Sequence, residues 1–235
     1  MRAVILAGGK GTRLMPYTSV FPKSLAPLGS KPILEILIHQ LKSNGVNHIT
    51  LCVNHLAHII KAYFKDGKEC GVKIDYSYET KELGTVGPLT LVKSLPKTFF
   101  VVNSDILATT NYKELLDTHI NNKALLTSSV YNQRHKIGYG VFNIEKDEVV
   151  GYKEKPNQSF PICAGSFVYD KKILSLIKRN EFLNFPQLMN LLLTQEKKIS
   201  LYQVKGTCID IGKPENYQKA IKTYIRNSDL FLNNQ

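Results

Sequence analysis

Residues 3–14 of the chain read AVILAGGKGTRL, and this stretch decides the fold. Its apolar beginning, residues 3–6, predicts a buried strand. The three glycines that follow suit neither a strand nor a helix, and they predict a loop whose backbone comes close to a ligand. Arg13 and, further on, Lys23 add cations to the exposed backbone N–H groups of this loop. Such a combination at the end of a strand favours binding of a nucleoside triphosphate.

The glycine spacing differs from that of two common nucleotide-binding motifs. No Gly-x-x-x-x-Gly-Lys-Ser/Thr sequence occurs, and Leu14 stands where a Gly-x-Gly-x-x-Gly motif starting with Gly9 and Gly11 would need its last glycine. A plain strand-to-helix turn with incidental charge is the alternative interpretation. Three glycines together with Arg13 and Lys23 favour phosphate binding over that alternative.

The length and composition indicate one soluble globular domain. The chain has 235 residues, of which 43% are hydrophobic and 21% are charged, and these values are ordinary for such a domain. We expect a single domain over residues 1–235, with one lobe at about 1–130 and a second at about 131–226. The net charge of +12 is spread along the chain rather than clustered. The first interpretation of this charge is a solvated, lysine-rich surface, and the second is attraction of small anionic substrates. We expect no nucleic-acid partner.

The cysteines and the absence of long apolar segments indicate the compartment. Cys52, Cys70, Cys163 and Cys208 include no closely spaced pair, so neither a zinc site nor a redox dithiol is predicted. The chain shows no secretory signal and no apolar stretch long enough to cross a membrane. We therefore expect a cytoplasmic protein with no membrane partner.

Strand and helix patterns alternate along the chain, which predicts an α/β fold. Strands are expected at residues 3–6, 48–53, 73–78, 99–102, 124–130, 140–144, 149–153, 162–169 and 199–204. Helices are expected from about residue 32 to 41, around 56–64, after an N-cap at Asn111, from a glycine turn at 84–87 to Leu95, and from Pro214 onward. This rhythm predicts a mixed, mostly parallel central sheet flanked by helices, with ligands at the carboxyl ends of its strands. The second half is expected to roof the resulting cleft, and the polar tail from Asn227 to fray.

Two aspartates are candidate metal ligands. Asp105 follows the apolar run at 99–102, so it is placed at the carboxyl end of a central strand, where it suits either a magnesium ion or a turn cap. Asp210 stands between two isoleucines, and burying its charge without compensation would be costly. A metal ion shared with Asp105 resolves that cost, while capping of the helix at Pro214 is the alternative.

Three further motifs suggest substrate contacts. The backbone of the turn at residues 84–87 is positioned to contact a base or a ribose. Glu154 and Lys155 end another strand, where the lysine suits a second phosphate and the glutamate suits hydroxyl groups; an exposed ion-paired loop is the alternative. Gly165 lies within an expected strand and allows a ring to approach the backbone closely. Nothing in the sequence resembles a Ser-His-Asp arrangement.

Taken in order, these motifs resemble the sugar-1-phosphate nucleotidyltransferases, the family that includes mannose-1-phosphate guanylyltransferase and the glucose-1-phosphate thymidylyl- and cytidylyltransferases. The resemblance covers essentially the whole chain. It is carried by residues 6–14, Pro22-Lys23, Leu25-Ala26-Pro27, residues 31–34, residues 83–87, Asn103-Ser104-Asp105, Tyr139-Gly140-Val141, Glu154-Lys155-Pro156, Ala164-Gly165 and residues 210–215.

The resemblance implies a Rossmann-like nucleotidyltransferase fold and a reaction that needs Mg²⁺. In that reaction a sugar 1-phosphate and a nucleoside triphosphate, with GTP favoured, give a nucleotide-sugar and pyrophosphate. The implied catalytic residues are Arg13, Lys23 and Asp105, and the implied metal ligands are Asp105 and Asp210. The implied nucleotide-binding residues are Leu6, Ala7, Gly8, Gly9, Gly11, Thr12, Arg13, Lys23, Glu79, Gly84 and Asn103. The implied sugar-phosphate-binding residues are Gly140, Glu154, Lys155 and Gly165.

Several residues depart from the family pattern. Ser104 stands where glycine is frequent, Thr207 and Cys208 where an aromatic residue is frequent, and Cys163 where asparagine is frequent. These changes leave the metal scheme intact and affect the choice of sugar. A cytidylyltransferase acting on a sugar or non-sugar phosphate, and a non-catalytic nucleotide-binding regulator, are the alternatives. A homo-oligomeric assembly is left open.

Overall fold

The central sheet is built from seven strands that carry most of the buried apolar residues. In the computed structural model, which describes residues 1–232, these strands are β1 (Arg2–Leu6), β4 (His48–Val53), β5 (Lys73–Tyr78), β6 (Thr98–Asn103), β8 (Leu126–Lys136), β11 (Asn157–Asp170) and β12 (Ile199–Gln203). Their order across the sheet is β12-β8-β11-β6-β1-β4-β5. β11 runs antiparallel to both of its neighbours, and the other pairs are parallel. The sheet is therefore mixed and mostly parallel, as predicted.

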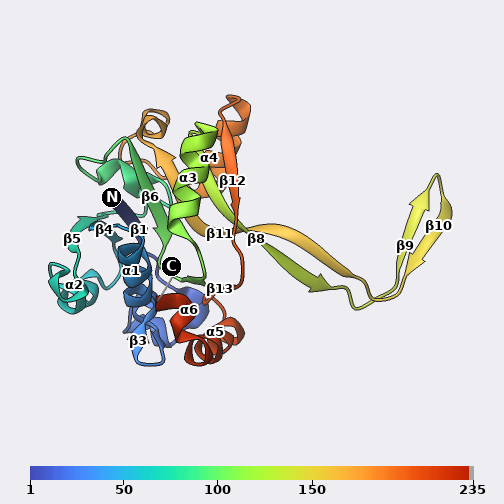
Figure 1. Cartoon of the computed structure of the whole chain (residues 1–235), viewed down its shortest axis with the longest axis horizontal. Helices are drawn as coiled ribbons and strands as arrows, with labels where there is room; N and C mark the ends of the chain where they lie inside the picture. The colour runs from blue at the N-terminus through green and yellow to red at the C-terminus, as the bar shows by residue number, and fades with distance from the viewer. Residues whose placement is uncertain (233–235) are drawn as a thin grey trace.

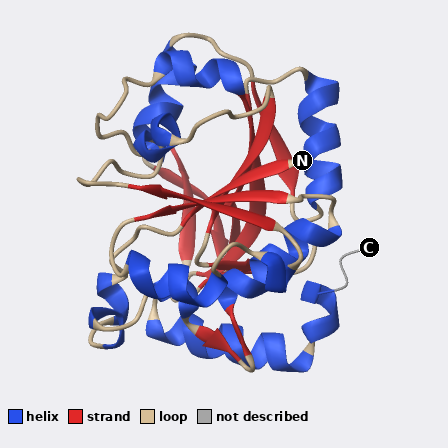
Figure 2. Ribbon diagram, turned by 90° about the vertical axis from the view of Figure 1, so that its left-hand side faces the viewer, coloured by secondary structure: helices blue, strands red, loops and turns tan. Residues whose placement is uncertain are grey.

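Helices cover both faces of this sheet, as Figure 2 shows. They are α1 (Ile33–Ser43), α2 (Ala57–Phe64), α3 (Tyr112–Asn122), α4 (Phe185–Thr194), α5 (Pro214–Arg226) and α6 (Ser228–Leu232). Apolar side chains of α1, α2 and α3 share one buried cluster with the sheet, and α4 contributes to the cluster on the other face. α5 and α6 pack on the outer side of α1 through a third cluster. This arrangement predicts that the ligand lies at the carboxyl edge of the parallel strands.

Three two-stranded sheets complete the fold. They pair β2 (Pro27–Leu28) with β3 (Lys31–Pro32), β7 (Ile106–Ala108) with β13 (Cys208–Asp210), and β9 (Val141–Glu145) with β10 (Glu148–Lys153). The β7–β13 pair joins the end of the first half of the chain to a segment near its C-terminus. The β9–β10 hairpin lies at the end of a projection that we call the arm, residues 131–162 (Figure 1).

The arm differs from the expectation that the second half roofs a cleft. β8 and β11 are longer than predicted and stay paired with each other from Tyr131↔Ile162 to Lys136↔Asn157, beyond the point where β12 ends. Figure 1 shows this ribbon and its terminal hairpin extending away from the body of the molecule. Within one chain, the arm therefore does not cover the body.

Two smaller predictions are also corrected. The expected helix from residue 84 to Leu95 is only a 3₁₀ helix, Gly87–Leu91, because Ser94 has a left-handed φ of 54° and Pro96 disfavours a helical conformation at Leu95. The tail forms α6 rather than fraying, because Phe231 is fully buried; the rest of that prediction, residues 233–235, lies outside the described residues.

No helix in residues 1–232 is long and apolar enough to span a membrane.

Candidate active site

The glycine loop after β1 is shaped by close packing at two of its glycines. A Cβ at Gly8 would lie 2.9 Å from Glu79 Oε1, so a larger residue does not fit without movement. Gly11 has a φ of 65°, and a Cβ there would lie 2.9 Å from Thr18 Cγ2. Thr18 Oγ1 also donates a hydrogen bond of 2.8 Å to the Gly11 carbonyl. In contrast, no described atom would lie within 4 Å of a Cβ at Gly9, so its backbone faces open space.

A cavity of about 730 Å³ opens beside this loop, at the carboxyl ends of β1 and β6. It is lined by the following residues: Leu6, Gly8, Gly9, Lys10, Gly11, Thr12, Lys23, Asn54, Glu79, Thr80, Lys81, Glu82, Gly84, Thr85, Pro88, Asn103, Ser104 and Asp105. Most of the residues predicted to bind the nucleotide are among them. Ala7 is not; it is buried, and its N–H donates to the Cys52 carbonyl at 2.8 Å.

The β7–β13 pair brings the two candidate metal ligands together. Asp210 stands opposite Ile106 in this pair, and the Ile211 N–H donates to the Asp105 carbonyl at 3.0 Å. Lys23 lies between the two carboxylates. Its Nζ contacts Asp105 Oδ2 and lies 3.7 Å from Asp210 Oδ1, while its side chain is only 10% exposed. A buried ammonium group needs such partners, because burying a lone charge costs several kcal/mol.

Arg13 completes a cluster of four charged groups. Its Nη2 atom lies 3.9 Å from Asp210 Oδ2, and its side chain is 59% exposed. Asp210 Oδ1 also accepts a hydrogen bond of 2.7 Å from the Gly212 N–H. A Cβ at Gly212 would lie 2.7 Å from Arg13 Nη2, so the glycine leaves room for the guanidinium group. Arg13, Lys23, Asp105 and Asp210 thus form one cluster, in which Lys23 and Asp105 line the cavity, whereas Arg13 and Asp210 lie beside it and are not among its lining residues.

The two carboxylates fit a magnesium site. Mg²⁺ is commonly held by one or two carboxylates, with phosphate oxygens and water completing its octahedron. Asp105 and Asp210 already converge on one positive charge, that of Lys23. In residues 1–232 no group of three or more His, Cys, Asp or Glu side chains is placed to hold a metal ion.

The far wall of the cavity is fixed by contacts with the segment before α4. Gly84 has a φ of 75°, and a Cβ there would lie 2.6 Å from the Leu183 carbonyl oxygen. Glu79 stands on the same wall, where burial raises the pKa of its carboxyl group. Its Oε2 accepts a hydrogen bond of 3.3 Å from the Leu83 N–H. This wall presents a carboxyl group and backbone atoms to a bound molecule.

Gly165 lies close to the cavity, inside a bulge of β11. It has a φ of 72°, and a Cβ there would collide with Ile106 Cδ1 and lie 3.2 Å from Asn103 Nδ2. The register of β11 against β8 shifts between Cys163 and Phe167. Cys163 lines a small neighbouring cavity of about 70 Å³ together with Leu6 and Asn103. Gly165 thus allows β11 to pack against the residues that lead to Asp105.

The remaining predicted sugar-phosphate residues lie on the arm. Gly140 precedes β9, and Glu154 and Lys155 directly follow β10, so all three lie where the terminal hairpin joins the β8–β11 ribbon. Lys155 Nζ lies 3.6 Å from Glu154 Oε1, and both side chains are more than half exposed. Within the described chain they do not line the cavity that holds Lys23.

Sequence reasoning missed several residues that line the cavity. They are Lys10, Asn54, Thr80, Lys81, Glu82, Pro88 and Ser104. The polar run at residues 80–82 follows β5, and its position after a parallel strand is the signal that places it at the ligand edge of the sheet. Lys10 lies within the glycine loop itself and could have been included for the same reason.

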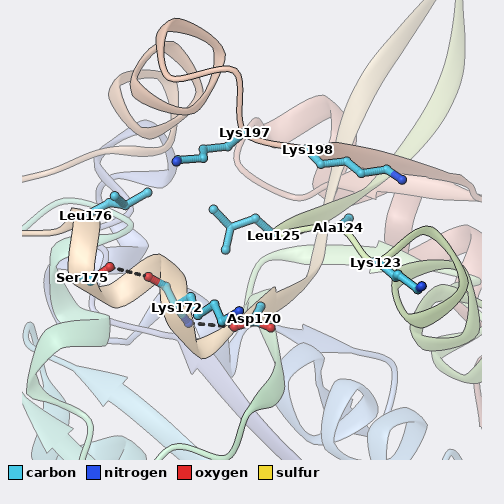
Figure 3. A pocket seen from close by; sticks show the side chains of 9 residues that line it. All are labelled: Lys123, Ala124, Leu125, Asp170, Lys172, Ser175, Leu176, Lys197 and Lys198. Carbon is cyan, nitrogen blue, oxygen red and sulfur yellow. Dashed lines mark hydrogen bonds between the residues drawn. The ribbon is translucent and has the colours of Figure 1, made fainter.

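A second hollow lies at the opposite edge of the sheet, where β8 and β12 begin. It has a volume of about 310 Å³ and four of its lining residues are Lys123, Lys172, Lys197 and Lys198. Figure 3 shows that the side chains of Lys197 and Lys198 point in different directions. The ammonium groups do not converge on a common point, so this hollow does not define an anion site.

The chain belongs to the nucleotidyl transferase family, whose model matches residues 2–227. It is 32% identical to mannose-1-phosphate guanyltransferase from Saccharomyces cerevisiae, over 96% of this chain and 65% of the relative. The Drosophila melanogaster mannose-1-phosphate guanylyltransferase catalytic subunit beta is 31% identical over 95% of this chain and 63% of its own length. The chain therefore spans less than two thirds of the length of these relatives.

Solved structures agree with the predicted fold. HddC from Yersinia pseudotuberculosis, in a crystal structure with GMP-PN, superposes with a TM-score of 0.74 at 26% identity. The match covers 95% of this chain and 99% of that chain. The family and this likeness confirm the expected Rossmann-like nucleotidyltransferase fold.

Proposed function

We propose that the protein transfers a nucleotidyl group from a nucleoside triphosphate, with GTP favoured, to a sugar 1-phosphate. The observation that carries this proposal is the meeting of Lys23 with Asp105 and Asp210 beside the glycine loop. Two relatives named as mannose-1-phosphate guanylyltransferases support the choice of GTP and of a sugar phosphate. The cavity of about 730 Å³ has the size expected of a small-molecule site.

The chemistry needs positioning and charge neutralisation rather than a strong base. An oxygen of the sugar phosphate attacks the α-phosphorus of the triphosphate, a new P–O bond forms, and the bond to the β-phosphate breaks to release pyrophosphate. The attacking oxygen is already anionic, so no side chain has to remove a proton. The site is consistent with this requirement, because its charged groups position and neutralise phosphate oxygens and none of them has to act as a base.

Each charged group then has a distinct role. The backbone N–H groups from Gly8 to Gly11 bind the outer phosphates, as glycine-rich loops at strand ends do. Lys23 faces the α-phosphate, and Arg13 balances charge on the departing pyrophosphate. Asp105 and Asp210 would hold Mg²⁺, which supplies charge neutralisation at the phosphate oxygens when it is bound.

The same proposal assigns a binding role to each of the two lobes of the chain. Residues 1–130 bind the nucleotide, and residues 131–226 bind the sugar phosphate through Gly140, Glu154, Lys155 and Gly165. The position of Gly165 beside Asn103 supports its part in this assignment. We also propose a cytoplasmic location, which the four free cysteine thiols support.

The direct test is pyrophosphate release with a matrix of five nucleoside triphosphates and several sugar 1-phosphates, in the presence of Mg²⁺. We expect turnover with GTP, with the product identified by mass spectrometry. A thermal-shift series with the five triphosphates reports the preferred base independently, because a ligand of the native state raises its melting temperature. Folded protein that releases no pyrophosphate with any pair would overturn the proposal. Turnover only with CTP and a non-sugar phosphate would replace it with the cytidylyltransferase alternative.

A further inference from the structure

The hairpin at the end of the arm has one apolar face. Phe142 stands opposite Tyr152, and Ile144 stands opposite Val149, so these four side chains lie on the same side of the hairpin. Their exposed fractions are 57%, 54%, 65% and 62%. The rings of Phe142 and Tyr152 are 5.2 Å apart and contact each other rather than the body.

An exposed face of this kind needs a covering surface. A two-stranded ribbon is at best marginally stable on its own in water, and contiguous exposed apolar side chains mark interaction sites. The body of the same chain does not cover the hairpin, because β8 and β11 carry it away from the body (Figure 1). The covering surface is therefore on another molecule.

The rim of the active-site cavity offers a matching surface. The segment between Gly11 and Lys23 contains no charged residue from position 14 to 22. In this segment Met15, Tyr17 and Val20 are exposed by 57%, 77% and 73%. Thr18 links the segment to the glycine loop through its hydrogen bond to Gly11. An apolar surface thus borders the site where the phosphates are proposed to bind.

We propose that the arm crosses to a second copy of this chain and lays its apolar hairpin face on residues 15–21 of that copy. The exchange is reciprocal, because a two-fold axis makes the same contact twice. In this dimer Glu154 and Lys155, at the end of β10, reach the active site of the other copy. The role of these two residues as sugar-phosphate ligands rests on the proposed function, while the dimer itself rests on the two apolar surfaces.

The charges at the active site favour this arrangement. The carboxylates of Asp105 and Asp210 offset the cations Arg13 and Lys23 in the cluster. A second phosphate brought next to the triphosphate requires an additional cation. Lys155 is exposed at the base of the terminal hairpin, and among the ion pairs of the described chain its charge is engaged only by the neighbouring Glu154. Each site is thus completed by the arm of the other copy.

The first experiment measures the mass of the protein in solution by sedimentation velocity. We expect a dimer for the wild type and a folded monomer for the double variant Phe142→Ser/Ile144→Ser. Ile120→Ser is the matched control, because Ile120 is 55% exposed on α3 and lies away from the arm; it should remain dimeric. A monomeric wild type, or a double variant that stays dimeric, would overturn the proposal. This result does not depend on any activity.

The second experiment asks whether each active site uses two chains. Lys155→Ala and Lys23→Ala are each expected to be nearly inactive, and each is mixed with the other so that subunits exchange. A mixed dimer pairs the intact body of the first with the intact arm of the second, so an equal mixture should regain about a quarter of wild-type activity. A mixture no more active than its components shows that the arm acts within its own chain, which contradicts the proposal. If the wild type transfers no nucleotide with any substrate pair, the proposed function fails, whereas sedimentation still decides the dimer.

Discussion

Lysine–carboxylate contacts occur both at the rim of the active-site cavity and on the arm, but the two lysines differ in burial and in the number of their partners. At the rim, Lys23 is nearly buried and contacts two carboxylates from distant parts of the sequence. On the arm, Lys155 is more than half exposed, and within residues 1–232 its one ion pair is with its neighbour Glu154. The difference shows that one region is completed by its own chain, while the other lacks the surface that would complete it.

The largest expected effect is the loss of activity on substitution of Lys23 at the rim of the cavity. Replacing Lys23 by alanine removes the cation that we propose to face the α-phosphate, and it leaves Asp105 and Asp210 without their shared partner. We expect kcat to fall by at least about 10³-fold, because preorganised charge supplies most of the rate enhancement in such a site. Steady-state pyrophosphate release measures this effect. The control is Lys113→Ala, which removes an exposed lysine of α3. A Lys23→Ala enzyme within tenfold of the wild type would refute the assigned role.

The next effect concerns the two carboxylates. Asp105→Asn and Asp210→Asn each remove a charged oxygen ligand from the proposed Mg²⁺ site. We expect the Mg²⁺ concentration for half-maximal activity to rise by about 10- to 100-fold in each variant. A magnesium titration at fixed substrate concentrations gives this value. An unchanged Mg²⁺ requirement in both variants would show that the pair does not hold the ion.

Substitutions at two glycines of the loop have smaller expected effects, and they separate protein stability from triphosphate binding. Gly11→Ala forces a side chain into a left-handed backbone position and against Thr18, so it should lower the free energy of unfolding by about 1–3 kcal/mol. Gly9→Ala meets no described atom, so it should leave stability within about 0.5 kcal/mol of the wild type and still weaken triphosphate binding. Urea unfolding and nucleotide titration separate the two effects. Equal nucleotide affinity in Gly9→Ala and the wild type would place the phosphates elsewhere.

The smallest expected effect compares a histidine of the body with one of the arm. His119 is buried in α3, its Nδ1 lies 2.9 Å from Thr127 Oγ1, and burial lowers its pKa below the usual 6.5. Since the unfolded chain takes up this proton more readily, the stability supplied by neutral His119 is present above pH 6.5 and is lost as the pH falls below it.

Melting curves over this range test the assignment. Between about pH 7.5 and about pH 5.5, the melting temperature of the wild type should fall more than that of His119→Gln. The matched control is His135→Gln, which changes an exposed histidine of the arm and should follow the wild type. An acid response of His119→Gln equal to that of the wild type would contradict the assignment.

The sequence predicted the strands of the body well and the surroundings of the arm poorly. β4 and β5 begin and end where predicted, because their apolar runs are bounded by polar turns. β7 and β13, which bring Asp105 and Asp210 together, have only three residues each and are too short to produce a recognisable pattern. The two acids were singled out from their neighbours, but their contact through Lys23 depends on that pairing.

The arm shows a different limit of sequence patterns. Phe142 and Ile144 alternate with polar residues as in any half-buried strand, and alternation does not reveal which molecule covers the apolar side. The same holds for α6, where Phe231, between Leu230 and Leu232, is buried by other elements. The local sequence pattern predicts a strand or a helix, whereas long-range contacts decide which surface covers its apolar side.

The most direct test of the catalytic centre follows the α-phosphate. GTP labelled at the α-phosphate is incubated with mannose 1-phosphate, Mg²⁺ and either the wild type or Lys23→Ala, and the products are separated by chromatography. We expect the label to appear in a nucleotide-sugar with the wild type and to stay in GTP with the variant. Transfer of the γ-phosphate to the sugar, or equal labelling by both proteins, would contradict it.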